Sequence, residues 1–243
     1  MKKIITILTI VFCINVNAQS GWLWAKSAGG TGDDYGNSVA TDDSGFVYVT
    51  GSFQFGTAYY YITKYNAAGN SVWTKFAGGN TTNNAGSGIA TDHNGNIYVT
   101  GDFTNASIIL GTDTLKNDSA GFDDIFLAKY DRNGNVLWAK SAGGKYSDDS
   151  KGISIDNSGN VYITGSLNAT ATFGTYTITS GAFITKYDQN GTVLWAKSAG
   201  GGLSTSISAD GLGNTYITGF YGSATITFGS VTLTNSDPFG GTW

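Results

Sequence analysis

The sequence predicts an all-β fold built from repeated four-stranded antiparallel sheets, and three observations support this prediction. First, the phrase Trp-Ala-Lys-Ser-Ala-Gly-Gly begins at Trp24, Trp138 and Trp195, with a variant at Trp73, so that the tryptophans lie 49, 65 and 57 residues apart. Second, the phrase Tyr-(Val/Ile)-Thr-Gly begins at Tyr48, Tyr98, Tyr162 and Tyr216. Third, 36 glycines, one proline and many β-branched, aromatic and turn residues favour short strands over helices. Such self-similarity indicates units that bury their apolar faces by stacking on one another.

The third unit shows the predicted strands most clearly. They are expected at 152–155, 161–165, 182–187 and 193–198. The stretches 156–160 (Asp-Asn-Ser-Gly-Asn) and 188–191 (Asp-Gln-Asn-Gly) have the chemistry of tight turns between the first and second and between the third and fourth strands. A longer connection over 172–179 is expected to form an extra small hairpin. Four antiparallel strands in each repeated unit is the pattern of a β-propeller blade.

The predicted domain organisation is a signal peptide followed by one propeller region. Residues 1–18 have a basic start, an apolar stretch and a small-residue cleavage site after Ala18, and they contain the single cysteine, Cys13. Residues 19–243 form the repeat domain. Its blades are expected at about 31–79, 80–144, 145–201 and 202–243, the last one incomplete, with 22–30 as a spare outer strand.

Two interpretations of the incomplete last unit follow. The strand at 22–30 completes the last blade and closes the ring, or the chain is the beginning of a longer protein. The second is preferred because four blades is the lower limit for a closed propeller. An open stack would leave an exposed strand edge, through which copies of the chain could associate.

The composition also bounds the class of protein. A cleaved signal peptide predicts a secreted or cell-surface protein with no stable membrane insertion. The formal net charge of -4 and a single arginine argue against a nucleic-acid partner. No cofactor is expected.

The repeated words resemble those of bacterial SBBP β-propeller repeat proteins. They are Gly-Gly-x-x-Asp-Asp, then Val-Ala-x-Asp-x-x-Gly-x-Val-Tyr-Val-Thr-Gly, then Phe-(Ile/Leu)-x-Lys-Tyr-(Asp/Asn)-x-x-Gly-x-x-x-Trp. The pattern appears at Asp33-Asp34 to Gly51, at Asp148-Asp149 to Gly165 and from Ala128 to Trp138. The sequence departs from the pattern at Asn83-Asn84 and at Ser204-Thr205, which stand in place of the aspartate pair. The resemblance implies a secreted or cell-surface propeller, and it implies the fold more firmly than a biochemical role.

No catalytic or metal-binding constellation stands out in the sequence. Asp-rich turns superficially resemble calcium loops, but their ligand spacing is wrong and the closing glutamate is absent, since every acidic residue is an aspartate. His93 is the single histidine and lies in a predicted turn, which argues against histidine-based triads and zinc sites. The chain is therefore expected not to be an enzyme, with no catalytic residue and no metal ligand nominated.

Candidate ligand-binding residues lie where the long connections are expected. Because strand direction alternates, the tight turns share one face of the propeller and the long connections and Gly-Gly links share the other. Loops on a rigid scaffold carry function disproportionately. The residues placed on this long-loop face are Asp33, Asp34, Asn83, Asn84, Asp148 and Asp149.

The function predicted from these features is a non-catalytic structural or adhesive module that binds a glycan or a protein. One alternative is a polysaccharide hydrolase or lyase that uses the long-loop aspartates, since a carboxylate pair is sufficient for glycoside cleavage. Another alternative is a scaffold region that serves a domain absent from this chain.

Overall fold

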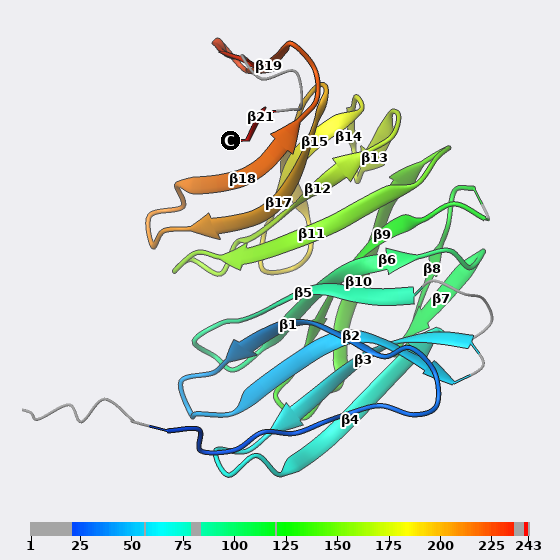
Figure 1. The fold of residues 1–243 in the computed structure, drawn as a ribbon, viewed down its shortest axis with the longest axis vertical. Helices are drawn as coiled ribbons and strands as arrows, with labels where there is room; N and C mark the ends of the chain where they lie inside the picture. Colours follow the sequence, from blue (N-terminus) through cyan, green and yellow to red (C-terminus); the bar gives the residue numbers. More distant parts are fainter. Residues whose placement is uncertain (1–20, 56, 79–83, 120, 236–240, 243) are drawn as a thin grey trace, which may run out of the picture.

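A computed structural model describes residues 21–55, 57–78, 84–119, 121–235 and 241–242, and all the regular structure in these residues is β-strand. The predicted signal peptide lies outside them. Four sheets follow one another along the chain and stack face against face, the first at the bottom of Figure 1 and the last at the top. We call these sheets blades 1 to 4, and the all-β propeller prediction is confirmed.

Each blade takes its strands in chain order. Blade 1 consists of β1 (Tyr35–Thr41), β2 (Val47–Phe55), β3 (Thr57–Tyr65) and β4 (Ser71–Gly78). Blade 2 consists of β5 (Asn84–Thr91), β6 (Ile97–Phe103), β9 (Asp124–Tyr130) and β10 (Val136–Gly144). Blade 3 consists of β11 (Asp148–Ile155), β12 (Val161–Leu167), β15 (Gly181–Tyr187) and β16 (Val193–Ala199). Blade 4 has β17 (Gly202–Ala209), β18 (Thr215–Tyr221) and the short β21 (Gly241–Thr242).

The tight turns explain why the strands end where they do. Asp156 Oδ1 accepts hydrogen bonds from the N–H groups of Ser158 and Asn160, each at 2.9 Å, and Gly159 takes a φ of +77° that other residues rarely adopt. The same carboxylate-centred turn recurs at Asp42, Asp92, Asp131, Asp188 and Asp210. The aspartates that resemble calcium loops are therefore engaged by their own backbone.

The hydrophobic core lies between blades rather than within them. Tyr48, Tyr98 and Tyr162, which open the second repeated phrase, are fully buried because each points from its own second strand toward the following blade. One cluster joins blades 1 and 2, a second joins blades 2 and 3, and a smaller one involves blade 4. Each blade is thus stabilised mainly by its neighbours, as the repeat pattern predicts.

In blades 1 and 2, the tryptophan of the outer strand and a lysine of the third strand contact a turn of the next blade. The Trp138 Nε1–H donates to Gln189 O at 3.1 Å, and Lys129 Nζ donates to the same oxygen at 3.2 Å. A Cβ on Gly191 would lie 3.1 Å from the Trp138 ring, so a glycine in this turn lets the indole pack closely. Between blades 1 and 2, Lys64 Nζ donates to Arg132 O at 3.1 Å and the Trp73 ring packs on Gly134. The repeated Trp phrase therefore encodes contacts between blades.

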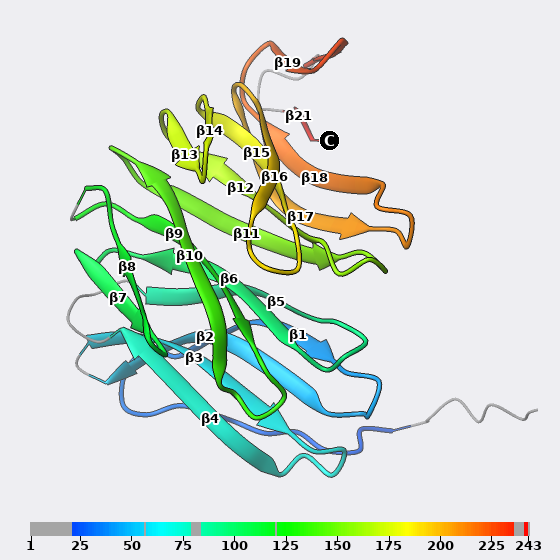
Figure 2. The same cartoon turned by 180° about the vertical axis from the view of Figure 1, so that it is seen from behind.

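The small hairpin predicted at 172–179 is present, and equivalent hairpins occur in two other blades. The three hairpins are β7–β8 (Ser107–Leu110, Asp113–Lys116), β13–β14 (Ala171–Phe173, Tyr176–Ile178) and β19–β20 (Thr225–Phe228, Val231–Thr234). Each lies in the connection from the second to the third strand. β13 pairs with β10 of the preceding blade, so this hairpin extends the blade 2 sheet across the boundary between blades (Figure 2).

The segment at 22–30 differs from its prediction, because the structure gives it no strand. An outer strand pairs with the third strand of its blade. In blade 1 the place beside β3 is already taken by β4, so the segment has no partner strand there. Trp24 nevertheless contacts a turn in the same way as Trp138 does. Its Nε1–H donates to Ala67 O at 3.2 Å, and its ring lies 5.9 Å from that of Tyr65.

Candidate functional site

The aspartates predicted on the long-loop face include two that tie the backbone together. Asp34 accepts hydrogen bonds from the N–H of Gly30 at 2.5 Å and of Gln54 at 2.8 Å. It therefore joins the incoming Gly-Gly link to the outgoing end of β2. Asp148 occupies the corresponding place in blade 3, where it accepts from the N–H of Asn168 at 3.3 Å and from that of Gly144.

The other predicted residues are spread over separate blades. Asp33 is exposed, and its N–H donates to Gln54 Oε1 at 3.3 Å. Asn84 is fully buried, and Asn83 lies outside the described residues. The Asp149 Oδ1 atom lies 3.9 Å from Lys151 Nζ. The five of these residues that the structure describes thus do not converge on one common pocket.

The structure also corrects the alignment of the repeats by one residue. Gly36, Gly86 and Ser150 face the closing glycine of the second phrase in their blades. The equivalent residues two positions earlier are therefore Asp34, Asn84 and Asp148, with Gly202 in blade 4. The pairs Asp33-Asp34 and Asp148-Asp149 are out of register because the Gly-Gly link differs in length between blades. Ser204-Thr205 is accordingly not the counterpart of either pair.

Three partly or fully buried carboxylates lie between blades 2 and 3, and sequence reasoning did not single out two of them. Burial raises the pKa of Asp124 to about 6 and the pKa of Asp148 to about 7, and both carboxylates accept from the Gly144 N–H. Burial likewise raises the pKa of Asp102 to about 8, although its Oδ1 accepts from the Ser150 N–H at 2.7 Å. Only their depth in the stack distinguishes these aspartates from the exposed ones.

We expect the Asp148→Asn variant to gain stability over the wild type as the pH rises. The folded-state pKa of about 7 exceeds the ordinary value of 3.8, so the folded chain holds this proton more tightly than the unfolded chain. The stabilisation is complete below about pH 4 and is lost as the pH rises through 7. Asparagine removes this loss, as Asn84 does naturally in blade 2. The free energy of unfolding, measured at pH 5 and pH 8, should shift in favour of the variant by about 2 kcal/mol between the two.

The matched control is Asp210→Asn, which changes the same group in a tight turn of blade 4. Hydrogen bonds from Asn214 and Leu212 lower the pKa of Asp210, so its stabilising contribution is already present at pH 5 and should change little between pH 5 and pH 8. An equal loss of stability at both pH values in Asp148→Asn would contradict the prediction.

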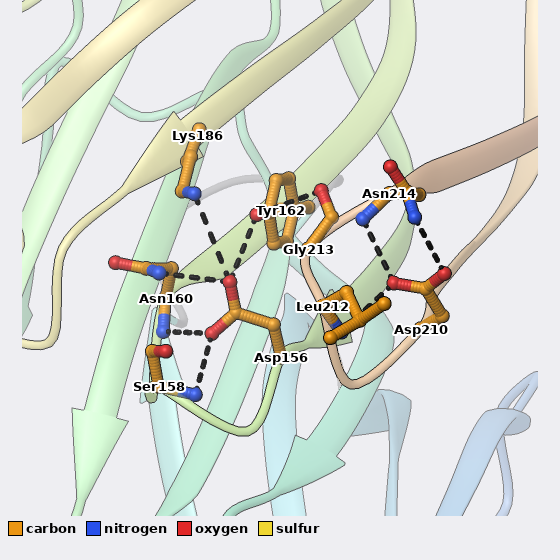
Figure 3. Close-up of polar contacts among 9 residues, drawn as sticks. All are labelled: Asp156, Ser158, Asn160, Tyr162, Lys186, Asp210, Leu212, Gly213 and Asn214. Atoms are coloured by element: carbon orange, nitrogen blue, oxygen red, sulfur yellow. Dashed lines mark hydrogen bonds and ion pairs between the residues drawn. The ribbon is translucent and has the colours of Figure 1, made fainter.

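The tight-turn face carries a second network, shown in Figure 3. Asp156 Oδ2 accepts hydrogen bonds from Tyr162 Oη at 2.9 Å and Asn160 Nδ2 at 2.8 Å, and lies 3.7 Å from Lys186 Nζ. The Tyr162 hydroxyl also lies 3.3 Å from Gly213 O, in the neighbouring turn of blade 4. Hydrogen bonds to the charged form keep the pKa of Asp156 below its usual value despite burial. This saturated network connects blades and leaves little capacity for a ligand.

A more open arrangement occurs around the axis of the stack, where the first strands of the blades neighbour one another. Each of these strands has a β-bulge at the same position, between Gly36 and Ser38, Gly86 and Gly88, Ser150 and Gly152, and Ser204 and Ser206. A bulge redirects the side chain of its extra residue. The four residues so placed, Asn37, Ser87, Lys151 and Thr205, line a shared hollow of about 280 Å³, which we call the axial hollow.

The axial hollow is polar and carries a single cation. Asn37 Nδ2 donates to Gly86 O at 3.0 Å, and Thr205 Oγ1 lies 3.3 Å from Thr218 O. Ser87 Oγ lies 3.3 Å from Asp102 Oδ2, and Lys151 Nζ is loosely paired with Asp149. These long or one-sided contacts leave donors and acceptors available. The sequence signal was present: each bulge residue differs between copies and is flanked by glycine or serine on both sides.

The fold and the repeated joints define a protein of the β-propeller repeat class. In particular, residues 23–52, 72–107 and 137–169 match the family described as "Beta-propeller repeat" (SBBP), so the chain contains SBBP β-propeller repeats.

The chain is similar over part of its length to one curated protein and to one solved structure. It is 32% identical over 148 residues to an "Uncharacterized WD repeat-containing protein L264" of Acanthamoeba polyphaga mimivirus, covering 52% of this chain and 11% of that protein. A crystal structure of a protein of unknown function from Bacteroides caccae has a TM-score of 0.44 and 13% identity, covering 85% of this chain and 59% of the other. The repeat matches and the WD-repeat relative indicate a repeat-built binding or scaffold module, although the chain spans only a small part of that relative.

Among the described residues, no helix is long and apolar enough to cross a membrane. No group of three or more histidine, cysteine or acidic side chains among them is arranged to hold a metal ion.

Proposed function

We propose that this chain is a non-catalytic binding module, secreted or held at the cell surface, that engages a glycan or protein ligand through the axial hollow. The observation that carries the proposal is the convergence of four bulge residues, one from each blade, on a single hollow. The residues that flank each bulge are small and repeated, whereas the bulge residue itself varies. A selective binding site needs side chains that differ from one another on a backbone that is the same in each blade, and the bulge residues have this property.

The chemistry of the hollow favours a glycan. Amide, hydroxyl and ammonium groups present several donors to a ligand rich in hydroxyl groups, and the surrounding strands hold them rigidly. Rigid placement reduces the entropy lost on binding. A protein ligand would present a polar loop to the same groups.

The proposal predicts that changes in the axial hollow weaken binding. In a panel of immobilised polysaccharides, Lys151→Met and Asn37→Ala should each lower the affinity for the best ligand about tenfold, which corresponds to about 1.4 kcal/mol. Lys116→Met is the matched control, because it removes the same charge from an exposed position on β8. Binding that is unaffected by both hollow variants would exclude this site.

A hydrolase or lyase is the second candidate, and one observation favours it. The pKa of Asp102 is raised to about 8, so this carboxyl next to Ser87 is protonated at neutral pH and could act as a general acid. The same polysaccharide panel decides between the candidates. Release of reducing ends that Asp102→Asn abolishes would favour the enzyme, and saturable binding without release would favour the binding module.

A further inference from the structure

Two exposed aromatic side chains meet on the long-loop face, where blades 2 and 3 adjoin. Phe122 precedes β9 and is 42% exposed, and Tyr146 precedes β11 and is 44% exposed. Their ring centroids lie 5.7 Å apart, and their planes make an angle of 75°. At this face β6 and β10 end and β9 and β11 begin (Figure 1). We call the pair of rings the aromatic platform.

The packing of the repeats does not account for these rings. The aromatic side chains of the repeated phrases pack between blades, whereas Phe122 and Tyr146 belong to none of the hydrophobic clusters. Tyr146 stands two residues before Asp148, and the residues in the corresponding places before blades 1 and 4 are Gly32 and Gly200. The platform therefore lies outside the contacts that the repeats share.

Hydrogen bonds hold both parts of the platform in place. The Phe122 carbonyl accepts from Asn117 Nδ2 at 2.9 Å. The N–H of the next residue, Asp123, donates to Ser147 Oγ at 3.2 Å, which joins the segment that carries Phe122 to the segment that carries Tyr146. Rings fixed in this way lose little conformational freedom when a ligand covers them.

Polar groups border the platform. Lys145 is exposed, and its Nζ atom lies 5.5 Å from the centre of the Tyr146 ring. Asp123 directly follows Phe122, and its Oδ1 atom accepts from Thr104 Oγ1 at 2.6 Å, which fixes the carboxylate. A ligand that suits this surface has an apolar face about as wide as one ring and hydroxyl groups at the edge of that face.

The size of the platform favours a sugar over a protein as this ligand. An aromatic side chain has about 200 Å² of surface, so two rings that are less than half exposed offer about 170 Å² together. A stable protein interface needs about 800 Å² on each partner. A pyranose ring with equatorial substituents fits better, because its axial C–H groups form an apolar face and its hydroxyl groups lie at the edge.

We propose that the aromatic platform is a second binding site, separate from the axial hollow, that takes a pyranose ring of a polysaccharide. The C–H face of the sugar packs on Phe122 and Tyr146. Its hydroxyl groups accept from the Lys145 ammonium and donate to the Asp123 carboxylate.

The test is the affinity of the chain for cellohexaose, measured by isothermal titration calorimetry. Every glucose unit of this β-1,4-linked oligosaccharide has equatorial hydroxyl groups and two apolar ring faces. Phe122→Ala and Tyr146→Ala should each lower the affinity about tenfold, whereas Tyr146→Phe, which keeps the ring, should retain it. Both side chains are exposed, so the variants keep the fold, and circular dichroism checks this.

Tyr176→Ala is the matched control. Tyr176 is 38% exposed, but its hydroxyl donates to Leu194 O at 2.7 Å, near the start of β16 at the tight-turn end of blade 3. This variant should bind cellohexaose as the wild type does. Inulin is the control ligand, because its furanose rings lack the flat apolar face, and it should bind more weakly than cellohexaose.

Two results would overturn the proposal: a wild type that does not bind cellohexaose, or binding that both alanine variants leave unchanged. Lys151→Met separates this site from the axial hollow, because it leaves the platform intact. Loss of affinity in Lys151→Met alone would support the hollow and overturn the platform. Loss in the platform variants alone would do the reverse, so this proposal and the proposed function can fail separately.

Discussion

Replacing Gly101 with alanine is expected to lower the free energy of unfolding by about 3 kcal/mol, because the added methyl group has no space. Its Cβ would lie 1.9 Å from the carbonyl oxygen of Ala85 and 2.7 Å from the Phe126 ring. The obstacle is backbone, which cannot move aside as the end of a flexible side chain can. Gly51 and Gly165 meet the same obstacle in blades 1 and 3, so their alanine variants should behave alike.

Gly36→Ala is the matched control, since the nearest atom to its Cβ is 3.6 Å away and its φ is not in the left-handed region. Thermal unfolding of the two variants should separate clearly, with Gly36→Ala close to the wild type. Similar midpoints for Gly101→Ala and Gly36→Ala would contradict this account of the repeated glycine. The glycine that closes the second phrase is thus required because it faces the bulge that directs a side chain to the axis.

Replacing Trp138 with alanine is expected to cost about 3 kcal/mol, because it removes a large side chain that packs between blades 2 and 3 and leaves a cavity there. The variant loses the indole packing on Gly191, the ring contact with Tyr98 at 6.1 Å and the hydrogen bond to Gln189 O. Lys129 would still bind the same carbonyl oxygen. The free energy of unfolding in denaturant measures this loss.

Trp195→Ala provides the comparison within the same repeated phrase. Trp195 keeps the ring contact with its own Tyr162, at 6.2 Å, but no hydrogen bond from its indole to a following turn occurs in the part of the chain that the structure describes. Its replacement should therefore cost clearly less than that of Trp138. Equal losses would show that the indole stabilises its own blade rather than the joint.

Much of the fold could be predicted from the sequence because local chemistry determines it. The Asp-x-x-Gly turns specify the hairpins through hydrogen bonds within five residues, and alternating apolar residues specify which strands are buried. The extra hairpin at 172–179 was predicted on the same basis. The repeated tryptophan and tyrosine phrases also predict that the units stack on one another.

The features that were missed depend on contacts between distant residues. The link from the Gly-Gly pair to the aspartate pair is one residue longer before blade 3 than before blade 1, so strand pairing aligns Asp34 with Asp148, although the repeated words align Asp33 with it. The segment at 22–30 has the sequence of an outer strand, but a strand forms only beside a partner strand. Burial of Asp102 and Asp124 arises where two blades meet, which no local pattern reveals. The axial hollow, in contrast, is marked in the sequence, because each blade has a variable residue between two small ones at the bulge.

The pairing of β13 with β10 has a mechanical consequence. Blades 2 and 3 share backbone hydrogen bonds across their boundary, at Gly143 with Thr172 and at Gly144 with Ala171, as well as apolar contacts. Among the described residues, the neighbouring boundaries are held by side-chain packing and isolated hydrogen bonds without a shared ladder. When tension is applied to the two ends of the chain, blades 1 and 4 can peel away singly, whereas blades 2 and 3 resist as one body. The boundary between blades 2 and 3 should therefore separate at a higher force than the other two boundaries, because of one short hairpin.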